Sequence, residues 1–126
     1  MEISLNGKRA LVCGASRGIG RAAAQELAKL GCAVTLMARD VDLLHKVRES
    51  LPVNAGQQHA VAAVDFASPD ELKKRVYPVL EQNGPFHILV NNTGGPPPGA
   101  AIDAVESEYL QAFSNHLVCG QILVQA

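Results

Sequence analysis

The segment KRALVCGASRGIG, residues 8–20, decides the fold of this chain. It begins with apolar residues typical of a strand, continues through three glycines, and leads into a helix pattern rich in Ala and Leu over residues 22–30. Gly14 allows a tight turn, Gly18 leaves no Cβ where a phosphate must approach the backbone, and Gly20 lets the helix pack closely on the strand. Because a helix amino end carries unpaired N–H groups and partial positive charge, we expect this segment to bind a pyrophosphate.

A second apolar segment, residues 32–37, completes a unit of strand, helix and strand. It ends about 20 residues beyond the glycine loop, which is the spacing of a dinucleotide-binding unit. The alternative is an ordinary turn between a strand and a helix, because closely spaced glycines often occur by chance. The complete unit of two strands and a helix favours nucleotide binding.

The glycines have the spacing G-x-x-x-G-x-G rather than the more widespread G-x-G-x-x-G. This loop resembles that of the short-chain dehydrogenase/reductase family, in which a Thr stands where this chain has Cys13. A thiol is a weak hydrogen-bond donor, so any contact made by that hydroxyl should be weaker here. The resemblance continues through Asp65, the NNTG segment at residues 91–94 and the last helical segment. The loop and the Arg after the second strand are most similar to the 3-oxoacyl-acyl-carrier-protein reductases.

Two further strand candidates, residues 59–64 and 87–91, alternate with helical segments. Ser68 is expected to cap the helix between them and Glu71 to complete a capping box, while Pro78 should kink that helix or end it early. Continuous apolar strands separated by helices indicate an α/β fold, a doubly wound parallel sheet of the Rossmann type covered on both faces. The inferred strand order is 3-2-1-4.

The end of the second strand indicates NADP(H) rather than NAD(H). Enzymes that prefer NAD place an acidic side chain there, whereas those that prefer NADP offer a cation to the 2'-phosphate. By resemblance, Ala38 occupies the acidic position and Arg39 follows it, while Arg17 adds a second guanidinium on the same side. Alternatively, both arginines are solvated surface charges, or Asp40 serves the ribose. Asp40 is more simply the N-cap of the helix pattern at 41–47.

The resemblance assigns further cofactor contacts at the carboxyl ends of the strands. The Asp65 carboxylate would accept from the adenine amine, Phe66 would offer backbone contacts, Asn92 would reach the adenosine ribose, and Asn91 would tie adjacent strands together. The segment GGPPP, residues 94–98, would line the nicotinamide end of the cleft. The residues expected to bind the cofactor are Gly14, Ala15, Ser16, Arg17, Gly18, Ile19, Gly20, Arg39, Asp65, Phe66, Asn92, Thr93 and Gly94.

The last helical segment would carry the family's catalytic Asn. Aligning Tyr109 and Leu117 with the family's aromatic residue and the Leu after its Asn places His116 in the catalytic position. A shift of one residue restores Asn115. We favour His116 over Asn115, because His116 could hold the water of a proton relay; alternatively it is an ordinary interior residue of the helix.

The proton donor of the family, a Tyr with a Lys four positions later and a Ser on the preceding strand, has no counterpart here. Tyr77 is followed by Glu81 and Tyr109 by Phe113, and no Lys follows Lys74. We interpret both tyrosines as packing on helix faces. We expect the chain to be the NADP-binding amino half, residues 1–126, of an enzyme of about 250 residues, and to be inactive by itself.

Composition limits the remaining possibilities. A chain of 126 residues with 48% hydrophobic content fits one globular domain, and a net charge of -1 gives no general attraction to nucleic acid or anionic membrane. The apolar runs are short and no export signal precedes them, so we expect a cytoplasmic protein. Cys13, Cys32 and Cys119 lack CxxC spacing and are interpreted as reduced core thiols, with no disulfide and no metal site.

The resemblance implies reduction of a carbonyl by hydride transfer from NADPH. The substrate would be a small molecule or a carbonyl carried by an acyl carrier, such as a 3-oxoacyl thioester. The alternative is a noncatalytic NADP-binding sensor or partner module. In the family the last helix helps to build a dimer interface, so we expect a homo-oligomer formed through its apolar residues, which are Leu110, Phe113, Leu117, Ile122 and Leu123.

Overall fold

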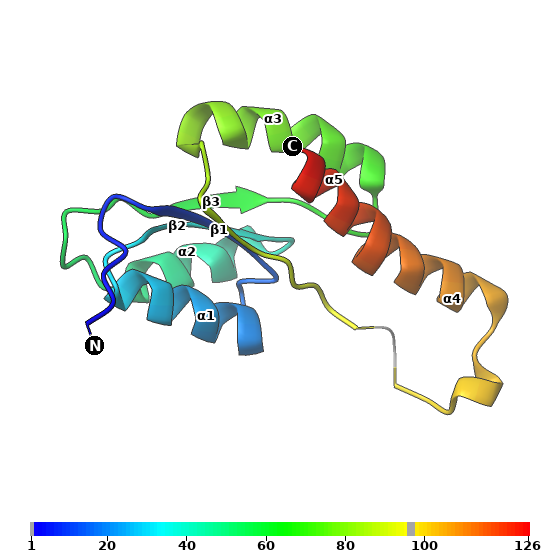
Figure 1. Ribbon diagram of the computed structural model, residues 1–126. Helices are drawn as coiled ribbons and strands as arrows, with labels where there is room; N and C mark the ends of the chain where they lie inside the picture. The colour runs from blue at the N-terminus through cyan, green and yellow to red at the C-terminus, as the bar shows by residue number, and fades with distance from the viewer. Residues whose placement is uncertain (1, 96–97) are drawn as a thin grey trace.

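The computed structural model describes residues 2–95 and 98–126, which form a parallel sheet between two layers of helices (Figure 1). Strands and helices alternate along the chain as far as residue 90. The elements are β1 (Arg9–Cys13), α1 (Gly18–Lys29), β2 (Ala33–Ala38), α2 (Val41–Ser50), β3 (Ala60–Ala63), α3 (Pro69–Asn83) and β4 (Ile88–Val90), then a short 3-10 turn (Ala101–Asp103), α4 (Glu106–Phe113), a π-helical segment (Ser114–Val118) and α5 (Cys119–Gln125).

The strands have the order β3-β2-β1-β4 and all pair in parallel, as the sequence predicted. Ala10 of β1 is the partner of Val34 in β2 on one side and of Ile88 in β4 on the other. Helices α1 and α2 cover one face, while α3 and α5 cover the opposite face (Figure 1). The strand order therefore reverses at β1, and ligands of such sheets bind beside this point at the carboxyl ends of the strands.

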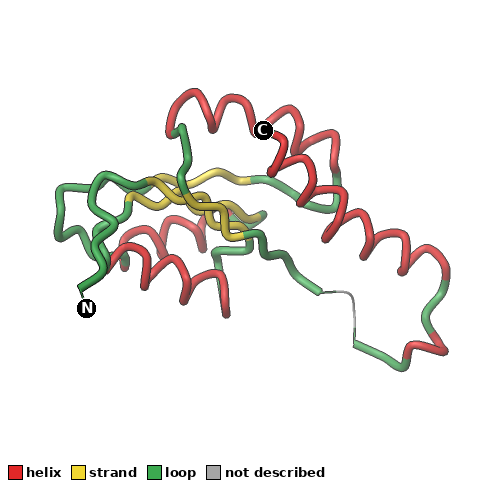
Figure 2. Tube along the Cα trace, in the orientation of Figure 1, coloured by secondary structure: helices red, strands yellow, loops and turns green. Residues whose placement is uncertain are grey.

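The core has two parts because side chains alternate between the faces of each strand. The part beneath α1 and α2 includes Ala10, Val12, Val34, Leu36, Ala24, Ala28 and Leu44. The part beneath α3 and α5 includes Leu11, Cys13, Met37, Leu72, Val76, Cys119 and Leu123. Figure 2 shows the strands enclosed between helices on both sides, which agrees with the continuous apolar pattern of the strands.

Two helices begin with the caps expected from the sequence. Asp40 Oδ1 accepts from Leu43 N at 3.0 Å, and Ser68 Oγ accepts from Glu71 N at 3.3 Å. The expected capping box at Ser68 is not completed. In a capping box the Glu71 side chain would accept a hydrogen bond from the Ser68 N–H. This N–H donates instead to the Asp65 carbonyl at 3.2 Å.

Helix α3 continues through Pro78 to Asn83, so the prediction that Pro78 ends it early is wrong. Pro78 is exposed, whereas Val76 and Val79 on either side of it are buried against the sheet. Water can therefore satisfy the carbonyl that lacks a partner, and the packed face holds the helix together.

The tyrosines are mostly exposed, at 64% for Tyr77 and 56% for Tyr109, so neither packs into the core. Because Val76 and Val79 occupy the buried face of α3, Tyr77 lies off that face. The Tyr109 hydroxyl donates to the carbonyl of Ala101 at 2.8 Å.

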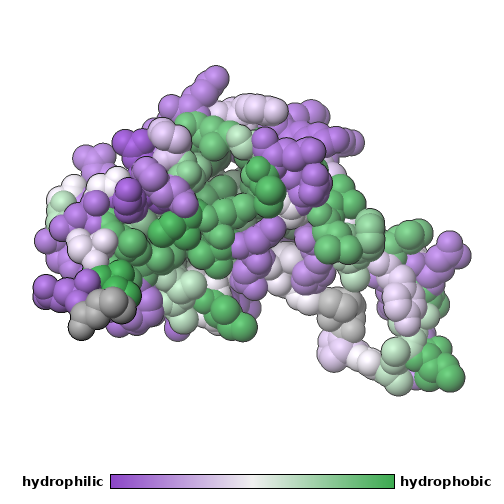
Figure 3. Space-filling model, viewed as in Figure 1, coloured by the Kyte–Doolittle hydropathy of each residue, from purple (hydrophilic) through white to green (hydrophobic). Residues whose placement is uncertain are grey.

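The last helix runs from α4 through the π-helical segment into α5, and only its final part is packed. Leu123 is buried and Ile122 packs against the same core, whereas Leu110, Phe113 and Leu117 are more than half exposed. Figure 3 shows the resulting apolar surface around α4 and the 3-10 turn. Among the described residues, no helix is both long enough and apolar enough to span a membrane.

Candidate functional site: a nucleotide-binding cavity

The glycine loop presents unpaired N–H groups at the start of α1. Gly14 and Gly18 have φ angles of +60° and +55°, which L side chains rarely adopt. Arg17 stands at the N-cap position without a side-chain cap, and the first turn of α1 contains no acidic residue. The first N–H of α1 that donates to a carbonyl among the described residues is that of Arg21, whose nitrogen lies 3.3 Å from the Arg17 carbonyl oxygen. The preceding N–H groups are therefore available to an anion.

The loop fits tightly against the segment that follows β4. A Cβ on Gly20 would collide with the Gly14 carbonyl oxygen, and one on Gly14 would lie 2.5 Å from Asn92 Nδ2. The same Nδ2 makes long hydrogen bonds to the carbonyls of Cys13 at 3.4 Å and Gly14 at 3.5 Å. Glycine is therefore required at both positions, because a methyl group would displace the loop from Asn92.

The side chain that ties the strand ends together is thus that of Asn92, whereas the sequence analysis gave this role to Asn91. The Asn91 amide instead lies against α5, where its Nδ2 would be 2.7 Å from a Cβ on Gly120. Adjacent strand residues point to opposite faces, so only one of the two can reach the glycine loop.

A cavity of about 710 Å³ opens at the carboxyl edge of the sheet, a size typical of cofactor sites. Every strand of the sheet contributes residues through its carboxyl end. The lining residues are 14 and 16–19 from the glycine loop, 38–40 from the end of β2, 65–67 from the loop after β3, 92–95 after β4, and Asn115. Of the prolines expected to line the nicotinamide end, Pro98 does not line this cavity, and Pro96 and Pro97 lie outside the described residues.

Two of the expected cofactor residues do not line this cavity. Ala15 is fully buried in the core, and its backbone N donates to the Met37 carbonyl at 3.4 Å. Gly20 is buried beneath the loop against Gly14. The sequence analysis omitted Ala67 from the site, although its position directly after Phe66 at a strand end could have indicated it.

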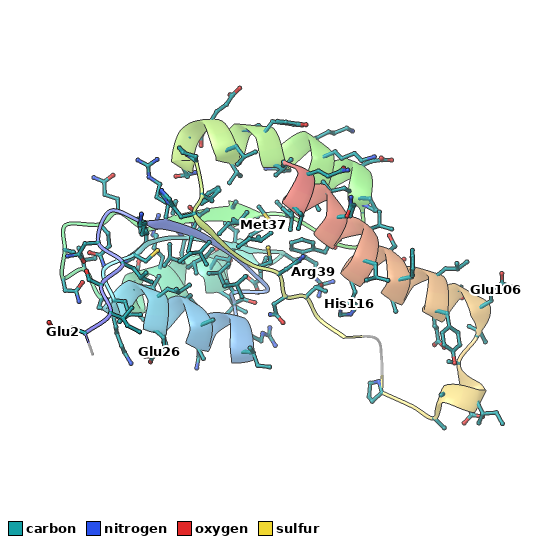
Figure 4. All side chains as sticks on the ribbon, viewed as in Figure 1. Glu2, Glu26, Met37, Arg39, Glu106 and His116 are labelled. Atoms are coloured by element: carbon teal, nitrogen blue, oxygen red, sulfur yellow. The ribbon has the colours of Figure 1, made fainter. Side chains whose placement is uncertain are left out.

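The two arginines lie where the end of β2 meets the glycine loop. Both are exposed and line the cavity, and Figure 4 places Arg39 at the sheet edge nearest the last helix. Within the described part of the chain, neither Arg17 nor Arg39 has a carboxylate within 4 Å. Asp40 also lines the cavity, but one of its oxygens accepts from Leu43 N, which confirms it as a helix cap. Ala38 supplies no charge, so this end of the cavity is cationic.

The loop after β3 is held by the last helix. Asp65 Oδ1 accepts from Ala67 N at 2.8 Å, which fixes the carboxylate at the rim of the cavity. The buried Phe66 presents its carbonyl to the last helix, and Cys119 Sγ donates to it at 3.2 Å. One atom of the Asn115 amide lies 2.7 Å from Gln111 Nε2, 2.9 Å from the same Phe66 carbonyl and 3.2 Å from the Gln111 carbonyl, so the side chain is held between the loop and the last helix.

The catalytic candidates Asn115 and His116 both lie in the π-helical segment. Asn115 lines the cavity, whereas His116 is exposed and does not. In Figure 4 the His116 ring projects from the segment on the side of the chain that follows β4. Single π turns occur often at functional sites. The structure therefore brings Asn115 to the cavity, while the assignment of His116 to the catalytic position stays a prediction.

The cysteines are buried and free, as predicted for core thiols. Burial raises the pKa of Cys13 to about 12, although the backbone hydrogen bond with Asn92 opposes this shift. Burial, followed by the negative charge of Asp65, also raises the pKa of Cys119. These thiols are neutral at physiological pH and contribute packing rather than a nucleophile.

The family model described as short chain dehydrogenase matches residues 8–123. The chain belongs to this family. It is 41% identical over 88 residues to a glucose 1-dehydrogenase of Gluconobacter oxydans, covering 70% of this chain and 33% of that protein. It is 39% identical over 92 residues to a 3-oxoacyl-acyl-carrier-protein reductase of Pseudomonas aeruginosa, covering 73% of this chain and 37% of the relative. The chain therefore matches about a third of the length of these two short-chain dehydrogenases.

A solved reductase has the same arrangement of elements. The L-sorbose reductase of Gluconobacter frateurii, crystallised with NADPH and L-sorbose, superposes with a TM-score of 0.87 at 32% identity. The match covers 99% of this chain and 48% of the reductase. This agreement confirms the parallel Rossmann-type sheet.

Proposed function

We propose that residues 1–126 form the NADP(H)-binding part of a short-chain oxidoreductase. The observation that carries this proposal is that an anion-binding helix end meets two arginines, neither of which has a carboxylate within 4 Å in the described ranges 2–95 and 98–126, while Ala38 supplies no charge. The pyrophosphate would lie at the amino end of α1, where Gly18 leaves open space, and the 2'-phosphate between Arg17 and Arg39. The crystallised relative with NADPH supports the same cofactor.

The remaining lining residues then divide the cavity into two ends. The loop at Asp65 would take the adenine, while Asn92 and residues 93–95 would lie along the path to the nicotinamide. The nicotinamide supplies a hydride when the cofactor is bound. The chain's own residues bind and orient it, and the π-helical segment at His116 would position the water of a proton relay.

Cofactor choice is tested by titrating NADPH and NADH into the chain. NADPH should bind more tightly, and Arg39→Ala should remove a charge-assisted contact of about 1.5–3 kcal/mol without a comparable loss for NADH. Arg21→Ala is the matched control, because Arg21 is an exposed α1 residue that does not line the cavity. Equal affinities for NADPH and NADH in the unmodified chain would overturn the proposal.

For the reaction we propose reduction of a carbonyl, with a 3-oxoacyl thioester as the candidate substrate. The similarity to a 3-oxoacyl-acyl-carrier-protein reductase supports this choice, although a sugar dehydrogenase is equally similar. Assays of the full-length enzyme, by NADPH oxidation with a 3-oxoacyl thioester or a sugar ketone and by NADP+ reduction with a polyol, would separate these substrate classes. Turnover of the sugar ketone without the thioester would overturn the thioester.

A noncatalytic NADP-binding module is the second candidate. The position of Tyr77 and Tyr109 outside the cavity supports it. The 126-residue chain by itself should bind NADPH without oxidising it, because neither Tyr77 nor Tyr109 lines the cavity, where it could donate a proton to a carbonyl. Oxidation that depends on a carbonyl substrate and survives repurification would overturn this expectation.

A further inference from the structure

Two histidines hold the outer strands of the sheet at their amino ends, away from the cavity at the carboxyl ends. His59 comes directly before β3, and His87 comes directly before β4. The Nδ1 atom of His59 accepts from Val34 N in β2 at 3.1 Å, and that of His87 accepts from Arg9 N in β1 at 3.0 Å. In both strand pairs an imidazole nitrogen therefore accepts a backbone N–H that a carbonyl would accept in a longer ladder.

The outer strands are short, so each of these bonds is a large share of their attachment to the sheet. β3 has four residues and β4 has three, and they are the two edge strands of the described sheet. The segments that follow them, residues 65–67 and 92–95, line the cavity. Release of the amino ends should therefore loosen the strands that carry these segments.

The hydrogen bonds require neutral imidazole rings. A ring nitrogen that accepts from a backbone N–H carries no proton of its own. In His59 the other nitrogen, Nε2, lies 2.9 Å from the Pro52 carbonyl and is therefore the one that donates. A second proton, on Nδ1, would face the Val34 N–H and break the bond between β2 and β3.

The charged groups around His87 offer a protonated ring no compensation. The Arg9 guanidinium donates to the Gly84 carbonyl at 2.6 Å, and Lys8 before it is also a cation. The buried residues of α3 are apolar. Across residues 2–95 and 98–126, no carboxylate lies within 4 Å of His87.

The surroundings of His59 are similar. The Cys32 thiol, which precedes β2, is neutral in acid because burial raises its pKa. The loop before His59 contacts the end of α1, where the Lys29 ammonium is paired with Glu26 at 2.6 Å. The buried residues of α2 are apolar, and within the same described ranges no carboxylate lies within 4 Å of His59. A proton gained by the folded chain would thus add an unpaired positive charge.

We propose that His59 and His87 form an acid-sensitive fastening of the sheet, which releases the amino ends of β3 and β4 when the rings gain a proton. Histidine is the side chain that ordinarily acquires its charge between about pH 8 and pH 5. The unfolded chain takes up these protons freely, whereas the folded chain must lose two hydrogen bonds to do so. Because the unfolded state binds more protons in this interval, stability falls as the pH decreases through it.

The first test reads the rings of the unmodified chain directly. The ¹⁵N chemical shifts of the imidazoles at pH 8 should show an unprotonated Nδ1 and a protonated Nε2 in both His59 and His87. A proton on Nδ1 of either ring would overturn its part in the fastening. This measurement needs no variant, so the proposal stays testable if a substituted chain fails to fold.

The second test is urea denaturation at pH 8 and pH 5.5. Asn has an acceptor oxygen close to the position of the imidazole Nδ1 but does not titrate, so the double variant His59→Asn/His87→Asn separates hydrogen bonding from protonation. The urea midpoint of the unmodified chain should fall between pH 8 and pH 5.5, and that of the double variant should fall by at most half as much.

His45→Gln is the matched control, because it removes a titratable imidazole from α2 and leaves both strand contacts in place. Its midpoint should fall as much as that of the unmodified chain. An equal fall in the double Asn variant would overturn the proposal, because other groups would then cause the acid sensitivity. A midpoint of the unmodified chain that does not change between the two pH values would overturn it as well.

Discussion

Replacing Gly18 with Ala should damage cofactor binding much more than it damages the fold. Gly18 has a φ of +55°, and no atom outside its chain neighbours and its own helix lies within 4 Å of the position of an added Cβ. The methyl group therefore meets no steric clash in the protein. The cost to stability comes from the left-handed backbone alone and amounts to roughly 1–2 kcal/mol.

The same open space is where the proposed pyrophosphate approaches the backbone. A methyl group there should hold the phosphate away from the N–H groups of α1, and we expect NADPH affinity to fall at least about tenfold, which corresponds to about 1.4 kcal/mol. Gly56→Ala is a matched control. Gly56 also has a positive φ, +70°, and open space around its Cβ position, but it lies between α2 and β3 and does not line the cavity.

Urea denaturation measures the stability term, and titration with NADPH measures the binding term. Gly18→Ala and Gly56→Ala should lower the free energy of unfolding by similar amounts, while only Gly18→Ala weakens binding. If both variants lose stability but Gly18→Ala binds NADPH as tightly as the unmodified chain, the glycine loop is an ordinary turn between a strand and a helix.

Three other measurements probe different parts of the structure. Burial raises the pKa of Cys13 from 9.0 to about 12. The neutral thiol therefore stabilises the fold fully below pH 9, and this contribution falls by about 1.4 kcal/mol per pH unit as the pH rises from 9 towards 12. Urea midpoints should fall above pH 9, and an equal fall in Cys13→Thr would contradict this. A Cβ added at Gly120 would lie 2.7 Å from Asn91 Nδ2. A double-mutant cycle should therefore show that Gly120→Ala is less destabilising when Asn91 is also replaced by Ala. If the changes in the free energy of unfolding are additive, the contact is refuted. Sedimentation should detect self-association through the exposed Leu110 and Phe113, and replacing both with Gln should shift the protein to monomer. An unmodified chain that is monomeric at micromolar concentration would rule out self-association through these residues.

The fold could be predicted from the sequence because several independent patterns gave the same answer. The apolar strand at the glycine loop, the helix after it and the second strand fix a parallel unit, and the caps at Asp40 and Ser68 place the starts of two helices. The behaviour of Pro78 could not be predicted this way. Whether a Pro ends a helix depends on the packing of its neighbours, here Val76 and Val79, and this packing is a property of the assembled core.

Backbone-level features of the site could be predicted, whereas side-chain roles were less certain. Positive φ angles at Gly14 and Gly18 follow from the need for a tight loop, so the spacing of glycines is informative. The difference between Asn91 and Asn92 depends on which face of β4 each occupies, and that face is set by register. Asn92 reaches the glycine loop and Asn91 reaches α5, a distinction that two identical adjacent residues do not reveal in a sequence.

The uncertainty between Asn115 and His116 has a physical origin in the π-helical segment. The alignment of this helix used Tyr109, which lies before the segment, and Leu117, which lies within it. A π turn accommodates additional backbone per turn, so residues before and after it do not keep the face that α-helical spacing predicts. Asn115 consequently lies on the face that carries Cys119 and meets the Phe66 carbonyl, while His116 is exposed beside it. A one-residue difference in alignment therefore separates two positions on the same turn, one at the cavity for Asn115 and one exposed beside it for His116.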